Sequence, residues 1–157
     1  MHTLKLNNNR IGEGGLPILK CLKSNSTLKT LNLSRNSIGK FSNIGGSVAT
    51  TVFEPLKLNS SLTHLSLEDN QFNDEVVKSL LDSLQSNHTL SALYIGCNKI
   101  GDGSTQSLVE YLQPNSTLTT LYLQESSINS HNASLIFEAL QSNCTLTNIS
   151  FRTNNID

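Results

Sequence analysis

Three cysteines and four histidines are the side chains in this 157-residue sequence that could supply a nucleophile, a general base or a metal ligand. Cys97 could act as a thiolate nucleophile if a histidine such as His64 lay within hydrogen-bond reach to take its proton. His64 could instead pair with the carboxylate of Glu68, four residues later. Whether either pair can meet depends on the elements that carry these residues.

The sequence contains six copies of one apolar repeat, which is the strongest pattern in it. One full copy reads Leu28-x-x-Leu31-x-Leu33-x-x-Asn36-x-Ile38. Later copies start at residues 62, 90, 118 and 146, so the spacings are 34, 28, 28 and 28, and a clipped first copy starts near residue 1. The Leu-x-Leu segment alternates as a strand does, whereas Leu108 and Leu112 are four apart and share one helix face. Each unit is therefore predicted to be a short strand followed by a helix.

This arrangement argues against catalysis. His64 and Cys97 would lie five strand positions apart on adjacent strands, roughly 17 Å, and His64 and Glu68 roughly 13 Å apart on one strand. His2, His88 and His131 fall in unrelated positions of the repeat, so no metal site is expected. The glycine pairs occupy the turns into the helices rather than a phosphate-binding loop. We therefore predict a non-enzymatic protein without a cofactor or metal.

Composition narrows the class of protein further. Leu, Ser, Asn and Thr account for 81 of the 157 residues, while charged residues make up 15% with a formal net charge of −1. A nucleic-acid binder would normally carry a basic excess, and no apolar run approaches the ~20 residues of a membrane span. An odd number of cysteines and the lack of a visible signal sequence favour a cytoplasmic protein with free thiols.

Asparagine recurs at two places in each unit, one after the strand and one after the helix. The second place produces five of the eight Asn-x-Ser/Thr glycosylation sequons, at residues 25, 59, 87, 115 and 143. A structural rule can therefore explain these sequons. Because Asn tolerates the left-handed conformation that often ends a helix, we expect these asparagines to adopt it.

The pattern LxxLxLxxNxI, followed by L-xxx-L-xx-N-x-x-L, resembles the ribonuclease-inhibitor-like class of leucine-rich repeats over essentially the whole chain. That class includes ribonuclease inhibitor, sensor domains of intracellular receptors, a Ran GTPase activator and actin-regulating tropomodulin relatives. The resemblance implies an α/β solenoid, a horseshoe arc with parallel strands on the concave face and helices on the convex face. It also implies that the first asparagines ladder their amides to neighbouring backbone. Residues at that position are Asn9, Asn36, Asn70, Asn98 and Asn154, whereas Ser126 departs from the pattern and should weaken the ladder.

The residues between the core leucines should lie on the exposed concave face. Tyr94 and Tyr122 occupy equivalent positions on neighbouring strands, about 4.8 Å apart, and are predicted to be adjacent. Tyrosine is a frequent anchor in protein interfaces, although it can also simply cover a sheet. An anchor of this kind would suit a partner with a flat basic or mixed surface. Candidate partner-binding residues on this face are Tyr94, Tyr122, His64, Glu68, Asp69, Glu125, Arg35 and Arg152.

The 34-residue unit carries six extra residues. Ile38-Gly39 and Ile44-Gly45 compete for one position of the repeat, and the inserted material includes Lys40, Phe41 and Asn43. Insertions in solenoids can form a binding rim or be tolerated surface loops. Pro55 falls late in the following helix pattern and is expected to bend or end that helix.

The ends of the chain show no capping unit of the kind that solenoids need. We therefore expect a single domain over residues 1–157 of about five and a half repeats, which is a fragment of a longer array or associates end to end through its open edge strands.

Three functions fit this reading. The first is a scaffold that binds a protein partner on the concave strand face. The second is a GTPase activator resembling the Ran regulator, although the acidic tail typical of that family is missing. The third is a recognition or sensor segment of a larger intracellular receptor.

Overall fold

The computed structural model describes residues 1–41 and 51–157, and its six short strands form one parallel sheet in chain order. The strands are β1 (Thr3–Lys5), β2 (Thr30–Asn32), β3 (His64–Ser66), β4 (Ala92–Tyr94), β5 (Thr120–Tyr122) and β6 (Asn148–Ser150). In the described part of the chain, the α-helices with defined bounds are α1 (Gly15–Cys21), α3 (Glu54–Leu58), α4 (Asp74–Leu84), α5 (Asp102–Leu112) and α6 (Ser130–Leu140), and the 3-10 helices are η1 (Gly12–Gly14) and η2 (Ile38–Phe41).

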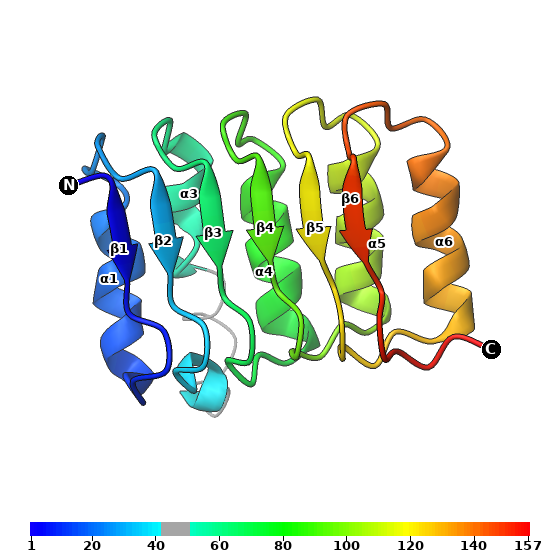
Figure 1. Ribbon diagram of the computed structural model, residues 1–157, viewed down its shortest axis with the longest axis horizontal. Helices are drawn as coiled ribbons and strands as arrows, with labels where there is room; N and C mark the ends of the chain where they lie inside the picture. The colour runs from blue at the N-terminus through cyan, green and yellow to red at the C-terminus, as the bar shows by residue number, and fades with distance from the viewer. Residues whose placement is uncertain (42–50) are drawn as a thin grey trace.

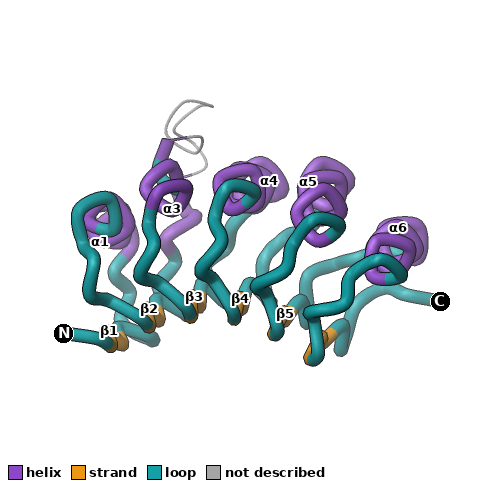
Figure 2. Tube along the Cα trace, turned by 90° about the horizontal axis from the view of Figure 1, so that it is seen from above, coloured by secondary structure: helices purple, strands orange, loops and turns teal. Residues whose placement is uncertain are grey.

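The strands line the inner side of a shallow arc and the helices its outer side (Figures 1 and 2), which confirms the predicted leucine-rich-repeat solenoid. Within the described residues, no helix is long and apolar enough to cross a bilayer.

The core is a stack of leucines between the two layers. Leu31, Leu65, Leu93 and Leu121 pair in register across β2 to β5, and each is 0% exposed. Leu4 and Ile149 continue the same column on the outer strands, where they are half-buried. Each unit therefore buries its apolar face against its neighbours, so a chain with few aromatic residues still forms a continuous core.

The first asparagines ladder their amides to neighbouring backbone, as expected, and Asn36, Asn70, Asn98 and Asn154 each tie two units together. Asn70 Oδ1 accepts from the backbone N–H groups of Asn36 and Ile38, both at 3.2 Å. Its Nδ2 donates to the carbonyls of Leu33 (2.9 Å), Leu67 (3.0 Å) and Glu68 (3.2 Å). Asn36 and Asn98 make the same set of bonds with their own neighbours. We call this series the first ladder.

The first ladder is interrupted where Ser126 replaces asparagine. The Ser126 hydroxyl donates only to Gln124 O, in its own turn. In four other units the N–H equivalent to that of Ile100 donates to an asparagine side chain. Ile100 N–H instead donates to the backbone carbonyl of Ser126. The predicted weakening of the ladder at Ser126 is confirmed.

The second asparagine of each unit does not adopt the left-handed conformation, so that prediction was wrong. Asn59 is extended, with φ −70° and ψ 119°. The positive-φ residues lie instead beside the first asparagines, at Asp69 and Cys97 for example. Asn87 Oδ1 accepts from the N–H groups of the second and third residues after it, and its Nδ2 donates to carbonyls of the preceding turn at 2.8 and 3.0 Å.

These bonds form a second ladder at the opposite ends of the strands. Asn59, Asn87 and Asn143 all donate to the preceding turn. For Asn115 the described part of the chain provides only the two acceptor bonds within its own turn. The third residue of each sequon donates its N–H to this asparagine. The hydroxyls of Ser61, Thr89 and Thr145 also donate to the asparagine carbonyl of the preceding turn, so a structural rule favours both Asn and Ser or Thr at these positions.

The inserted segment is partly outside the described residues. Ile38 fills the repeat position, because it is buried and its N–H donates to the ladder residue Asn70. The competing Ile44 and the candidate loop residue Asn43 lie outside the described residues, and Lys40 and Phe41 belong to η2. The expectation for Pro55 was wrong. It lies in the first turn of α3, where a missing N–H costs no helical hydrogen bond.

A carboxylate joins two helices on the outer layer. Asp74, in the first turn of α4, accepts hydrogen bonds from the backbone N–H groups of Gly101 (2.8 Å), Gly103 (3.2 Å) and Ser104 (3.0 Å) and from the Ser104 hydroxyl. It thereby caps the N-terminus of α5, which has no side-chain cap of its own. Partial burial raises the pKa of Asp74, but these hydrogen bonds outweigh burial and hold the pKa below its usual value.

Asn70→Ala should destabilise the fold more than the substitution of a side chain that makes one hydrogen bond, because five backbone groups lose their hydrogen-bond partner. We expect a loss of about 3 kcal/mol or more in the free energy of unfolding, measured by urea denaturation. Ser126→Ala at the equivalent position removes one hydrogen bond and should cost about 1 kcal/mol or less. Equal losses in the free energy of unfolding for the two variants would contradict a stabilising role for the asparagine side chains of the first ladder.

Asp74 should make stability fall in acid. Since its pKa is lower in the folded state than in the unfolded chain, its contribution is complete above the unfolded pKa and is lost as the pH falls through the folded pKa. Urea midpoints measured from about pH 5 down to about pH 2.5 should therefore converge for the native chain and Asp74→Asn. Glu75→Gln, which removes the exposed neighbouring carboxylate, is the matched control. A constant gap between native chain and Asp74→Asn at every pH would contradict the assignment.

Candidate protein-binding surface

Tyr94 and Tyr122 are partners in the β4–β5 register, and both side chains are half-buried. Their ring centroids lie 5.1 Å apart with an interplanar angle of 72°, an edge-to-face arrangement. Asn148, on the next strand, donates to Tyr122 Oη at 3.3 Å. The predicted adjacency of the two tyrosines is confirmed, and we call the pair the tyrosine patch.

A side-chain bridge crosses three strands beside this patch. Gln124 Nε2 donates to the carboxylate of Glu68, two strands away, across the intervening Gly96. A Cβ on Gly96 would come within 2.7 Å of the Gln124 side chain, so the glycine leaves the space that the bridge needs. Sequence reasoning did not single out Gln124. The only signal was a glycine among the larger residues of its column.

Three carboxylates lie where β3 and β5 lead into their turns, and we call Glu68, Asp69 and Glu125 the acidic rim. Asp69 forms an exposed ion pair with Arg35, with 3.8 Å between Arg35 Nε and Asp69 Oδ2 and side chains 69% and 52% exposed. Such a pair contributes little to stability and leaves both groups accessible to a partner.

Of the other two candidate residues, His64 lies apart from the tyrosine patch and the acidic rim, whereas Arg152 adjoins Glu125 of the rim through its backbone. His64 is exposed at the start of β3, and its Nδ1 shares a hydrogen bond of 2.9 Å with Thr63 Oγ1. Arg152 is exposed in the turn after β6, where its carbonyl accepts from Glu125 N–H. Among the described residues, no group of three His, Cys, Asp or Glu side chains could hold a metal ion.

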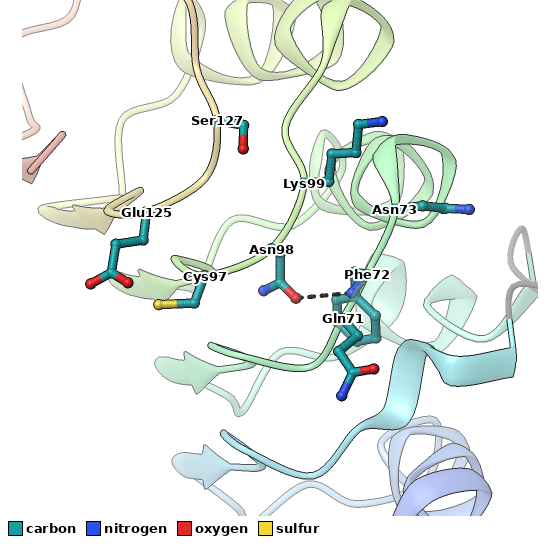
Figure 3. Close-up of a pocket in the computed structure, with 8 residues that line it drawn as sticks. All are labelled: Gln71, Phe72, Asn73, Cys97, Asn98, Lys99, Glu125 and Ser127. Carbon is teal, nitrogen blue, oxygen red and sulfur yellow. Dashed lines mark hydrogen bonds between the residues drawn. The ribbon is translucent and has the colours of Figure 1, made fainter. Parts of the chain in front are cut away.

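A shallow recess of about 390 Å³ opens beside the acidic rim. Its lining comes from three successive turns, residues 71–73, 97–99, 125 and 127. Glu125 and Ser127, in the third of these turns, flank Ser126, so the recess lies at the interruption of the first ladder. Figure 3 shows the intact ladder bond on the other side, from Phe72 N to Asn98 Oδ1 at 3.0 Å.

The pKa of the Cys97 thiol reflects the electrostatic potential of this region. Burial raises the pKa of its thiol most, and the charges of Glu125, Asp69 and Glu68 raise it further, while Arg35 lowers it. A raised pKa keeps the thiol protonated near neutral pH and makes it a poor nucleophile. The acidic rim therefore imposes a negative potential at Cys97.

Comparison with known families and structures agrees with the fold. A family model described as "Leucine Rich repeat" matches residues 24–40, 58–81 and 86–109. No curated protein is similar enough in sequence to count as a match.

Two similar solved structures are a leiomodin-1 fragment and a tropomodulin domain. The structure titled as leiomodin-1 Actin-Binding Site 2 has a TM-score of 0.69 and 20% identity, over 85% of this chain and 76% of that one. The C-terminal domain of tropomodulin from Caenorhabditis elegans has a TM-score of 0.66 and 13% identity, over 86% of this chain and 80% of that one. At these identities the likeness extends to the fold alone.

Glu125→Gln should lower the pKa of the Cys97 thiol, because it removes the charge that raises this pKa most. Alkylation by iodoacetamide at fixed pH should then become about threefold faster. The measurement needs a background in which the exposed Cys21 and Cys144 are serine. Glu138→Gln, an exposed carboxylate on α6, is the matched control and should leave the rate unchanged. An unchanged rate in Glu125→Gln would show that Glu125 does not set the potential at Cys97.

Proposed function

Because the chain is a leucine-rich-repeat protein, we propose that it is a non-enzymatic interaction module that binds a protein partner on its concave strand face. The tyrosine patch is the observation that carries this proposal. Two rings held edge to face on adjacent strands present apolar surface and two hydroxyls to the same side of the sheet.

The rigid support beneath each ring favours a binding role. Tyr94 and Tyr122 stand on strands whose core leucines are fully buried and which pair in register with each other. A side chain on such a scaffold loses little conformational freedom when a partner arrives, and tyrosine has only two rotatable side-chain bonds. Buried aromatic anchors of this type account for much of the affinity in protein interfaces.

The surroundings of the patch support a partner with polar as well as apolar contacts. On one side lies the Gln124–Glu68 bridge and on the other Asn148, which bonds the Tyr122 hydroxyl. Interfaces commonly combine a central aromatic anchor with a polar rim. His64, Arg35, Arg152 and the acidic rim belong to that outer zone in this proposal.

Actin is the first partner to test, because the structure titled as leiomodin-1 Actin-Binding Site 2 shares the fold. Co-sedimentation with filaments and a pyrene assembly assay would detect binding to filaments and to monomers, respectively. A negative result in both would remove actin and leave the concave-face proposal to be tested with other partners.

The double variant Tyr94→Ala/Tyr122→Ala should reduce partner affinity by about tenfold or more, because both anchors are lost. The readout is pull-down followed by titration of the recovered partner against native and variant chains. Leu58→Ala is the matched control: Leu58 is an apolar side chain, 83% exposed, at the end of α3 on the outer layer.

Circular dichroism should show that the double variant remains folded. Undiminished affinity in the folded double variant, or an equal loss in Leu58→Ala, would refute the concave-face assignment.

A further inference from the structure

We propose that the partner presents an extended basic segment, one arginine or lysine of which docks at the Cys97–Glu125 end of the recess while the segment continues over the tyrosine patch. This inference rests on the proposed function and names the chemistry of the partner. It is carried by the shape of the recess, the charges on its edge and the distance to the tyrosines.

The recess provides a seat for one long side chain. Its lining combines polar side chains, among them Gln71, Asn73, Asn98 and Ser127, with apolar surface that includes the largely buried Phe72. It is open to solvent rather than enclosed, so an incoming charged group keeps part of its hydration. A recess of this kind suits an arginine or lysine whose charged group lies at the solvent-exposed edge and whose aliphatic part packs against the inner surface.

The charges at the mouth select a cation. Glu125 is exposed, and the described part of the chain offers its carboxylate no ion pair or hydrogen bond. In Figure 3 the Glu125 carboxylate and the Cys97 sulfur point to the same side, while the Lys99 amine points away from them. The charge of Glu125 is reinforced by Asp69 and Glu68, and Arg35 only partly offsets them through its long contact with Asp69.

Other kinds of segment fit less well. An acidic side chain would meet the Glu125 carboxylate within the negative potential that Asp69 and Glu68 reinforce, and an apolar one would have to desolvate Glu125 without replacing its hydration. A guanidinium or ammonium group instead gains a charge-assisted hydrogen bond from a carboxylate that is otherwise only hydrated.

The distance to the tyrosine patch fits one extended peptide. Tyr94 and Cys97 are three residues apart in the chain, about 10 Å if extended. Side chains two residues apart on an extended segment are separated by about 7 Å, and an arginine spans the remaining gap. A second basic side chain could then lie against the face of a tyrosine ring, which attracts cations.

The test uses two labelled nine-residue peptides, one alternating arginine with serine and one alternating glutamate with serine. Fluorescence polarisation with the full chain should show the arginine peptide binding at least about tenfold more tightly than the glutamate peptide. Its affinity should fall as salt rises, because the contacts at the mouth are solvent-exposed. Equal binding of the two peptides would overturn the inference.

Two isosteric variants locate the site. Glu125→Gln and Asp69→Asn should each weaken the arginine peptide by about threefold to tenfold, because each removes one charge. Glu138→Gln on α6 removes an equal charge from the outer layer and should have no effect. Equal weakening in all three variants would mean that the peptide responds only to net charge, which would overturn the assigned position.

A second readout is chemical protection. With Cys21 and Cys144 replaced by serine, bound arginine peptide should slow alkylation of Cys97, which lines the recess. Alkylation at an unchanged rate under saturating peptide would also overturn the position.

The two proposals can fail separately. Loss of protein partner binding in Tyr94→Ala/Tyr122→Ala together with equal binding of both peptides would keep the concave-face function and reject the basic segment. Arginine-peptide binding that depends on Glu125 but is untouched by the tyrosine variants would support the seat in the recess and reject the role of the tyrosine patch.

Discussion

Side-chain amides of asparagine hold this molecule in register. Each strand has only three residues, too few to fix its own alignment, but each laddered asparagine is bonded to the backbone of two units. Register places each core leucine opposite another leucine, or opposite Ile149 on β6, and every intervening side chain on the concave face. The tyrosine patch, the acidic rim and the recess all inherit their positions from this constraint.

Much of the fold was predictable because a repeat multiplies weak local signals. A single Leu-x-Leu segment is ambiguous, but six copies, four of them at an exact 28-residue spacing, fix strand order, parallel direction and register together. The same logic predicted that Tyr94 and Tyr122 would touch and that Ser126 would interrupt the first ladder. Each of these conclusions follows from position within the repeat and requires no knowledge of side-chain conformation.

The features that sequence reasoning missed depend on how far individual side chains reach. The Gln124–Glu68 bridge requires both the length of glutamine and the empty space at Gly96. Asp74 caps a helix that begins 28 residues later, through a rotamer that no periodicity specifies. The sequence predicted the wrong backbone conformation for the second asparagines. Asparagine after a helix is compatible both with a left-handed helix cap and with a side-chain amide that bonds to the neighbouring unit. The structure has the second arrangement, with extended backbone at Asn59.

Both ladders skip the same junction. The first lacks its asparagine at Ser126, and Asn115, in the described residues, makes no bond to the turn before it, so β4 and β5 are the pair least fastened at their ends. If one junction between repeats has fewer hydrogen bonds than the others, the curvature of the solenoid changes most readily at that junction. The tyrosine patch spans this junction, with one ring on each side. A partner bound to both rings would therefore restrict motion at the β4–β5 junction and set the angle between the two halves of the solenoid.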